Sequence, residues 1–240
     1  MTVTFLPSGD TAIVIEFGDE IDRAVSEEVL RLGARIRGAG IAGILELVPT
    51  FRSLLVHYDP LRLTAAELTD RVQALPRDET TLTQTRTLWH VPVCYEAELA
   101  PDLADVAAQT GLTRDAVVAL HSGTDYHVYM IGFLPGFPYM GDLPAPLVLK
   151  RRSDPRVRVP PGAVAIAMAM TAIYPLQSPG GWHLLGTTPI RLFDLSQPAP
   201  SLFSPGDAVR FAPVDRATFE AVQAAVGRGE YRVPHERLGA

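Results

Sequence analysis

Three segments in the second half of the chain are rich in glycine and proline, and their aromatic rings and backbone N–H groups are candidates for binding a substrate or a partner. They cover residues 132–141 (GFLPGFPYMG), 160–166 (PPGAVAI) and 173–182 (IYPLQSPGGW). The glycine pair Gly180 and Gly181 permits close approach of a ligand to the backbone and offers N–H groups to an oxyanion or a phosphate. The pattern therefore predicts an anion-binding site edged by backbone donors.

The aromatic rings on residues 132–141 can be ordered only if they pack against something. They either belong to the core or form the apolar wall of a pocket or the contact surface for a partner. Tyr126 and Tyr129 lie three residues apart on a predicted strand, so their side chains are expected on opposite faces. The candidates for binding a substrate or a partner are Tyr129, Phe133, Gly136, Phe137, Tyr139, Thr171, Tyr174, Ser178, Gly180, Gly181 and Trp182.

Two residues are candidates for catalysis. His121 closes a predicted helix, where it serves either as an acid, a base or a substrate donor, or as a cation that interacts with the last carbonyls of the helix. Arg158 is chosen from a local basic run, which either forms a solvated face or binds a phosphate or a carboxylate. The run consists of Lys150, Arg151, Arg152, Arg156 and Arg158.

The cysteine and histidine residues offer few possibilities for a disulfide, a nucleophile or a metal site. Cys94 is the only cysteine, which excludes an intramolecular disulfide and a cysteine-based zinc cluster. In the apolar run WHVPVCY it is expected to be a small buried hydrophobe rather than a nucleophile. His90 and His127 share no metal-ligand spacing with a carboxylate or a cysteine, so no metal is assigned.

Composition narrows the class of protein. The 240 residues carry 21 Lys and Arg against 27 Asp and Glu, a net charge of −6, which argues against nucleic acid as a partner. The most apolar stretch, 163–176, is too short to cross a membrane and contains Pro175. The N-terminus has no signal-peptide pattern, so a cytoplasmic location is expected.

Residues 1–76 are predicted to form a small α+β domain. Strands are expected at 11–17, 44–48 and 53–58. A helix is expected from Asp22, as its cap, to Gly38, as its end. The sequence Thr64-Ala65-Ala66-Glu67 predicts a capping box at the start of a second helix.

Residues 77–87 have no apolar periodicity and are predicted to be a linker. Beyond it, residues 88–240 alternate short strand-like runs with Pro and Gly turns, which is typical of a closed or nearly closed β-barrel. Helices are expected near 102–109 and 113–121, and a terminal helix is expected from Asp215 to Gly227.

These segments together resemble the family that contains the B subunit of 5-oxoprolinase, also known as kinase inhibitor KipI or allophanate hydrolase subunit 1. The similarity extends over nearly the whole chain. It includes the segments at residues 9–12, 46–49, 58–60, 92–95, 121–122, 186–189 and 204–207.

The resemblance implies an α+β N-terminal domain followed by a cyclophilin-like β-barrel. It also implies a hetero-oligomer with the C and A subunits of 5-oxoprolinase. The B and C subunits together resemble the carboxyltransferase part of urea carboxylase. In the family, ATP hydrolysis activates the lactam of pyroglutamate and the A subunit completes ring opening to glutamate, so ATP is the implied cofactor, bound by this chain or shared with its partner.

One stretch departs from the family. Relatives carry glycine, glutamine and glycine where this chain has Met168, Met170 and Ala172, and arginine where it has Thr187. These differences leave the expected fold intact and put the substrate and the turnover in doubt.

Two other functions stay open. A KipI-like inhibitor would bind a sensor histidine kinase and block its autophosphorylation, which needs only a complementary surface. The resemblance is also compatible with part of an allophanate or urea-type amide hydrolase. Proline isomerisation rests on fold analogy alone.

Overall fold

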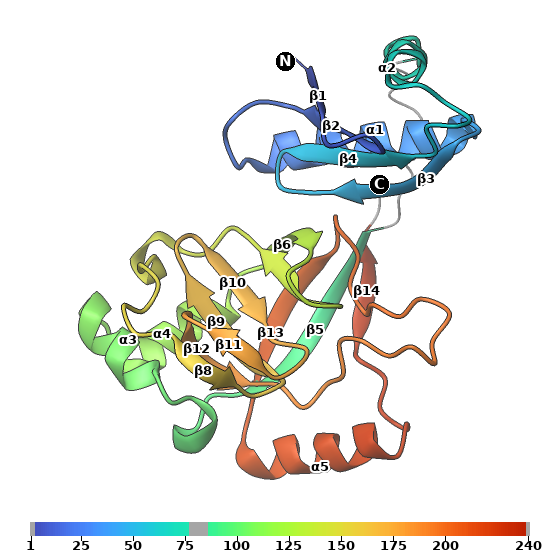
Figure 1. The fold of residues 1–240 in the computed structure, drawn as a ribbon. Helices are drawn as coiled ribbons and strands as arrows, with labels where there is room; N and C mark the ends of the chain where they lie inside the picture. The colour runs from blue at the N-terminus through green and yellow to red at the C-terminus, as the bar shows by residue number, and fades with distance from the viewer. Residues whose placement is uncertain (1–2, 77–85, 239–240) are drawn as a thin grey trace. The chain divides into compact units, whose positions relative to one another are not determined.

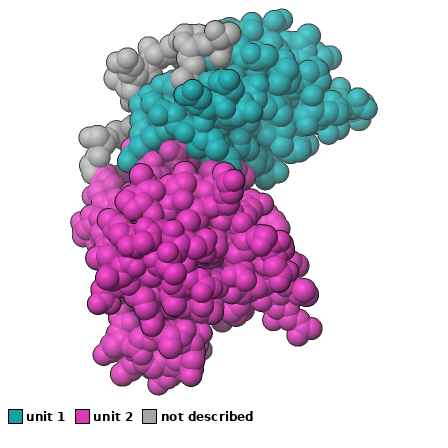
Figure 2. Space-filling model, turned by 90° about the vertical axis from the view of Figure 1, so that its left-hand side faces the viewer, with its two compact units in different colours: residues 1–85, 240 teal, residues 86–239 magenta. Residues whose placement is uncertain are grey.

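The computed structural model describes residues 3–76 and 86–238, which belong to two units, one within residues 1–85 and one within 86–239 (Figures 1 and 2). The predicted linker, 77–87, lies outside the described residues except for Arg86 and Thr87, which begin a strand of the second unit. Each unit has its own buried apolar core.

The first unit is an antiparallel four-stranded sheet with the order β1-β2-β4-β3. Its helix α1 runs along one face of the sheet (Figure 1) and buries Val29, Leu32 and Ile36 in a cluster with Ile15 and Val56. Its elements are β1 (Thr4–Pro7), β2 (Ala12–Glu16), α1 (Arg23–Ala39), β3 (Ile44–Pro49), β4 (Ser53–Tyr58) and α2 (Ala65–Gln73).

Local capping interactions set the helix ends in this unit. The Asp22 carboxylate accepts hydrogen bonds from two backbone N–H groups of the first turn of α1, and Thr64 and Glu67 form the predicted reciprocal capping box. The predicted end of α1 at Gly38 is wrong, because the helix continues to Ala39 and Gly40 adopts the left-handed conformation (φ 57°) that closes it.

Seven strands of the second unit close into a mixed barrel, which confirms the predicted barrel. The strand order is β12-β9-β10-β7-β6-β13-β5, and β5 returns to β12 where Cys94 faces Thr187. Only β5 and β13 pair in parallel among the barrel strands described. The barrel strands are β5 (Arg86–Cys94), β6 (Tyr126–Ile131), β7 (Pro138–Met140), β9 (Ala163–Ala167), β10 (Met170–Ile173), β12 (His183–Thr187) and β13 (Ala208–Val214).

Shorter elements surround the barrel. Strand β14 adds to the outer edge of β5, and β8 and β11 form a separate two-stranded ribbon. The bounds are η2 (Ala97–Leu99), α3 (Leu103–Thr110), α4 (Arg114–Ser122), η3 (Ala145–Leu147), β8 (Arg156–Val159), β11 (Ser178–Gly180), α5 (Arg216–Gly227) and β14 (His235–Leu238). Among the helices of the described ranges, none is both long and apolar enough to span a bilayer.

Strand β9 is buried on both faces, and this determines where the site lies. Val164 and Ile166 point into the barrel core, whereas Ala163, Ala165 and Ala167 belong to a second cluster on the other side of the sheet. A strand with two buried faces needs a second layer to cover it. Here that layer consists of aromatic side chains that pack on the small alanines.

Gly162, which precedes β9, has a φ of 81°, and a Cβ built there would lie 2.3 Å from the carbonyl oxygen of Thr188. We expect Gly162→Ala to lower the free energy of unfolding by about 2 kcal/mol or more, because left-handed strain adds to a clash with backbone. Urea denaturation measures the change. The matched control is Gly227→Ala in α5, where an added Cβ meets nothing within 4 Å; equal losses in both variants would contradict the prediction.

Candidate functional site

The rings singled out in the sequence come together on the outer face of the barrel. The ring centroid of Phe137 lies 5.1 Å from that of Tyr174, 4.9 Å from Tyr139 and 6.2 Å from Trp182. Their planes meet at 57–88°, the edge-to-face range that the ring quadrupole favours. We call these four residues the ring cluster.

The ring cluster rests on a floor of small side chains from β9 and β10, which are Ala163, Ala165, Ala167 and Ala172. Phe137, Tyr174 and Trp182 are almost fully buried, while Tyr139 is partly exposed. The ring centroid of Phe133 lies 5.4 Å from that of Phe137, and Phe133 is 62% exposed. The rings therefore pack on one another, and a ligand would meet the margin of the cluster.

Glycines permit the close packing at that margin. A Cβ on Gly180 would lie 2.3 Å from the hydroxyl oxygen of Tyr174, and a Cβ on Gly136 would lie 2.9 Å from the Cβ of Phe193. The Gly181 carbonyl accepts a 2.8 Å hydrogen bond from the backbone N–H of Arg152. This bond ties the SPGGW segment to the basic run.

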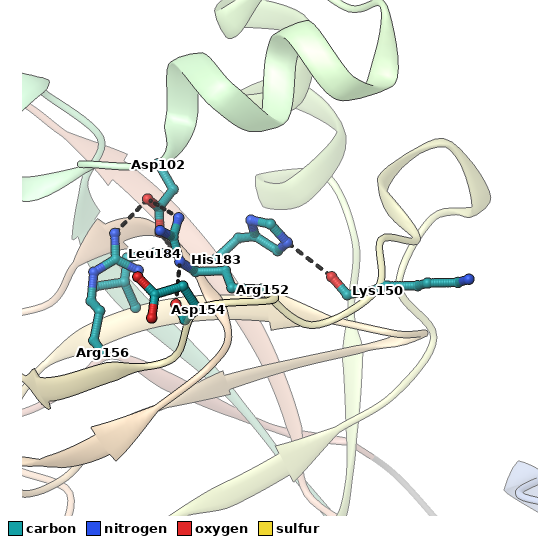
Figure 3. Close-up of polar contacts among 7 residues, drawn as sticks. All are labelled: Asp102, Lys150, Arg152, Asp154, Arg156, His183 and Leu184. Atoms are coloured by element: carbon teal, nitrogen blue, oxygen red, sulfur yellow. Dashed lines mark hydrogen bonds and ion pairs between the residues drawn. The ribbon is translucent and has the colours of Figure 1, made fainter.

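A buried carboxylate organises the basic run (Figure 3). Asp102 is 2% exposed, and its Oδ1 accepts hydrogen bonds from Arg156 at 2.5 Å and from Arg152 at 3.1 Å. Its Oδ2 accepts the backbone N–H of Leu184 at 2.7 Å. Figure 3 shows both guanidiniums pointing toward Asp102, whereas the Lys150 side chain extends away from the cluster.

Sequence reasoning misses this role of Asp102. The local pattern marks the residue only as the start of a helix, and its partners lie 50 or more residues further along the chain. No local pattern signals a long-range ion pair of this kind. The structure thus assigns two arginines of the basic run to a buried ion pair rather than to a solvated face.

The other arginines of the run take different positions. Arg151 lies over the ring of Trp182, with its guanidinium carbon 6.0 Å from the ring centroid. Arg158, the predicted catalytic arginine, is exposed on β8, two residues from Arg156. A guanidinium over an indole face is favourable because the face carries negative electrostatic potential.

These charges influence the pKa values of two phenols in the ring cluster. Burial raises the pKa of Tyr174 to about 12, and the nearby guanidiniums of Arg151 and Arg156 oppose that shift. Burial also raises the pKa of Tyr139, again opposed by Arg151. Both hydroxyls are therefore protonated at neutral pH and able to donate a hydrogen bond.

His121 and Thr171 come together inside the barrel, on the side of the sheet opposite the ring cluster. The His121 Nε2 lies 3.0 Å from the Thr171 hydroxyl, and its Nδ1 lies 2.9 Å from the Tyr95 hydroxyl. The imidazole stacks on Phe211 and is fully buried. Burial lowers the pKa of His121 to about 3, so the alternative interpretation of His121 as a helix-terminal cation is wrong.

The remaining candidates make other contacts. Tyr129 packs against Gly141, and Tyr126 belongs to the barrel core, as expected for opposite faces. Ser178 pairs with Val159 in the β8-β11 ribbon. Cys94 is fully buried, as predicted.

A cavity of about 720 Å³ lies elsewhere, between α4, η2 and the start of α5. None of the candidate binding residues lines this cavity, and no residue of the ring cluster borders it. Within the described ranges, no three His, Cys, Asp or Glu side chains gather as a metal ion would require.

The buried, neutral His121 predicts a specific pH dependence. In the unfolded chain the imidazole has an ordinary pKa near 6.5, so below that pH the unfolded state binds a proton that the folded state does not. Its stabilising contribution is complete above pH 6.5 and declines toward pH 3. Between pH 7.5 and 5.0, wild type should lose roughly 2 kcal/mol more than His121→Gln in urea unfolding.

The matched control is His235→Gln, which removes an exposed imidazole and should retain the pH dependence of wild type. Parallel loss of stability in wild type and His121→Gln would contradict the placement of a neutral imidazole in the core.

Comparison with known proteins agrees with the predicted resemblance. Residues 3–203 match the family model of the carboxyltransferase domain, subdomain C and D. The chain is 34% identical over 227 residues to a protein of Bacillus subtilis (strain 168) named as the B subunit of 5-oxoprolinase, and the match covers 89% of this chain and 93% of the relative.

Two solved structures share the fold. The crystal structure of TTHA0988 is 38% identical with a TM-score of 0.76; the match covers 85% of this chain and 40% of that longer chain. The Kluyveromyces lactis urea carboxylase, at 22% identity, has a TM-score of 0.78, with 98% of this chain and 24% of the enzyme covered, and shows likeness of fold alone. The chain therefore belongs to the carboxyltransferase-domain family, subdomain C and D, together with proteins named as B subunits of 5-oxoprolinase.

Proposed function

We propose that this chain is the B subunit of an ATP-dependent 5-oxoprolinase, which opens 5-oxoproline (pyroglutamate) to glutamate in the cytoplasm. The observation that carries the proposal is the identity to the Bacillus subtilis relative over nearly the full length of both chains. The word subunit in that name supports an assembly of several different chains. In the proposal, the C and A subunits are the partners and this chain alone is inactive.

The chemistry explains why ATP is needed. The lactam of 5-oxoproline is a resonance-stabilised amide and a poor electrophile. Transfer of the γ-phosphoryl group of ATP to the lactam oxygen, with ADP leaving, turns that oxygen into a leaving group. Water then attacks the former carbonyl carbon and the C–N bond breaks, which gives an acyl phosphate. A second water hydrolyses this acyl phosphate, phosphate departs and glutamate is formed.

In this proposal the chain contributes positioning and charge stabilisation. The backbone at Gly180 and Gly181 and the exposed Arg158 are the groups that we assign to the phosphoryl group in transit. These groups suit it chemically, because arginine and glycine-rich backbone are common donors to phosphate oxygens. The sequence has no Walker loop, so the rest of the nucleotide site is assigned to the partner.

His121 is assigned a positioning role. Its hydrogen bond to Thr171 fixes β10 from the inside of the barrel, and Tyr174, just after β10, belongs to the ring cluster on the outside. The imidazole therefore supports the strand that leads to the site rather than exchanging a proton with the substrate.

A KipI-like inhibitor of a histidine kinase is the second candidate, and the departures from the family favour it. Met170 and Ala172 pack in the cluster that contains the rings, and Met168 is 54% exposed with a φ of 54°, a conformation that favours glycine. An exposed methionine in a strained turn suits an adaptable protein contact.

The test is reconstitution with homologues of the A and C subunits. We expect ATP-dependent formation of glutamate from 5-oxoproline only when all three chains are present, because activation and ring opening take place on different subunits. Coupled measurement of ADP and glutamate checks this. No 5-oxoproline-dependent rate above the mixture lacking this chain would reject the proposal, and co-purification with a histidine kinase instead would favour the inhibitor.

A further inference from the structure

Arg152 and Arg156 lie close together because both bond to the same carboxylate oxygen. Oδ1 of Asp102 accepts one hydrogen bond from each guanidinium, at 3.1 Å and 2.5 Å (Figure 3). The carboxylate brings one negative charge to two positive charges, so this group of three side chains keeps a net positive charge. We call Arg152 and Arg156 the arginine pair.

Most N–H donors of the arginine pair have no acceptor on the described residues. A guanidinium has five N–H groups, and that of Arg156 uses one of them, on the Asp102 carboxylate. The Nη1 of Arg156 is buried and has no hydrogen-bond partner within the described ranges. Arg152 donates to Asp102 and to the backbone carbonyl of Asp154. Because a buried donor without an acceptor is unfavourable, the pair favours a further acceptor.

The arginine pair can be approached from solvent, although its carboxylate cannot. The side chains of Arg152 and Arg156 are 27% and 25% exposed, whereas that of Asp102 is 2% exposed. An anion that arrives from solvent therefore meets the guanidiniums rather than the carboxylate. The nearby Asp154 is exposed, and among the described contacts its carboxylate pairs with neither arginine.

Two further groups that suit an anion lie beside the arginine pair. Arg158 follows Arg156 by two residues on β8, so its exposed side chain points to the same face of that strand. Gly180 is the register partner of Arg156 across the ribbon of β8 and β11. The backbone N–H of Arg152 donates to the Gly181 carbonyl at 2.8 Å. The pair is thus continuous with the groups that the proposed function assigns to the phosphoryl group.

The charges favour a phosphate group over a carboxylate. Once the charge of Asp102 is subtracted, the arginine pair retains one positive charge, and Arg158 adds a second. A phosphate monoester carries close to two negative charges at pH 7 and three acceptor oxygens, and guanidiniums bind such oxygens through parallel N–H groups. A single carboxylate would leave one positive charge without compensation.

We propose that the arginine pair and Arg158 together bind a phosphate group. The inference rests on the proposed function for the source of that group, which is the γ-phosphoryl group in transit from ATP to the lactam. Arg152 and Arg156 are then substrate-binding residues of the phosphoryl-transfer site, in addition to the groups already assigned to it.

The first experiment tests binding without turnover. Isothermal titration calorimetry of the full chain at constant ionic strength should show one inorganic phosphate bound per chain. Acetate, a monoanion, should bind at least about 10-fold more weakly. Arg156→Lys keeps the charge but loses the planar fork of donors, so it should weaken phosphate binding about 10-fold.

Arg158→Gln should weaken phosphate binding to a similar extent, and this variant is expected to fold because Arg158 is exposed. The matched control is Arg191→Gln, which removes an exposed arginine paired with Asp194 and should leave phosphate binding unchanged. Circular dichroism shows whether each variant is folded.

The second experiment uses the assembly with the C and A subunits. Arg156→Lys and Arg158→Gln should lower kcat for glutamate formation by about 10- to 100-fold, because a donor to the phosphoryl group in the transition state is lost. KM for 5-oxoproline should change much less, and Arg191→Gln should retain the wild-type kcat. A higher KM for ATP at unchanged kcat would support the phosphate site and assign it to the bound nucleotide.

The two experiments separate the inference from the proposed function. The inference is overturned if wild type binds no phosphate, binds acetate equally well, or binds phosphate no better than either folded variant. It is also overturned if the assembly is active and both variants keep the wild-type kcat and KM for ATP. If the assembly is inactive toward 5-oxoproline, the proposed function fails and calorimetry alone decides the inference.

Discussion

The carboxylate of Asp102 is the interaction on which the candidate site depends. It is withdrawn from solvent, and it joins three separate parts of the second unit: the start of α3, residues 152–156 and strand β12. A buried charge is tolerated only when its partners and hydrogen bonds are complete, and removing one partner typically costs about 3–5 kcal/mol. Here both oxygens have partners, so Arg152 and Arg156 of the basic run are held in one arrangement.

The bonds of Arg152 and Arg156 to Asp102 determine which guanidiniums of the basic run lie at the ring cluster. With Arg152 and Arg156 drawn toward Asp102, the adjacent Arg151 lies over Trp182, on the margin of the ring cluster. The rings can pack there because β9 and β10 present alanines on their outer faces. Larger side chains on those strands would lift the rings away from the sheet. Small residues, rings and the guanidinium of Arg151 thus form a single structural unit.

Much of the fold follows from signals that are local in the sequence. Three helix caps bond to backbone N–H groups no more than three residues further along the chain, and each lies where the sequence predicts it. They are Asp22, Thr64 and Asp215. Strand β1 (Thr4–Pro7) is not predicted, because four residues that end in proline are a weak strand signal. Gly40 rather than Gly38 ends α1, since both glycines are plausible stops and only backbone conformation distinguishes them.

The candidate site was predictable only in part, because some of its contacts join residues that are far apart in the sequence. Glycine, proline and aromatic residues in segments 132–141 and 173–182 predict rings packed at a glycine-lined turn, and the structure brings them together. The positions of Arg152 and Arg156 depend on Asp102, which is remote in sequence, and no pattern links them. The burial of His121 likewise depends on its packing against Phe211 of β13, which its own helix does not reveal.

A double-mutant cycle between Asp102 and Arg156 tests the central claim most directly. Urea unfolding of Asp102→Asn, Arg156→Gln and the double variant gives the coupling free energy between the two side chains. A buried, hydrogen-bonded pair predicts a coupling of at least about 2 kcal/mol, with the double variant little less stable than either single one. Additive losses, within about 0.5 kcal/mol, would show that Asp102 does not hold the basic run in place.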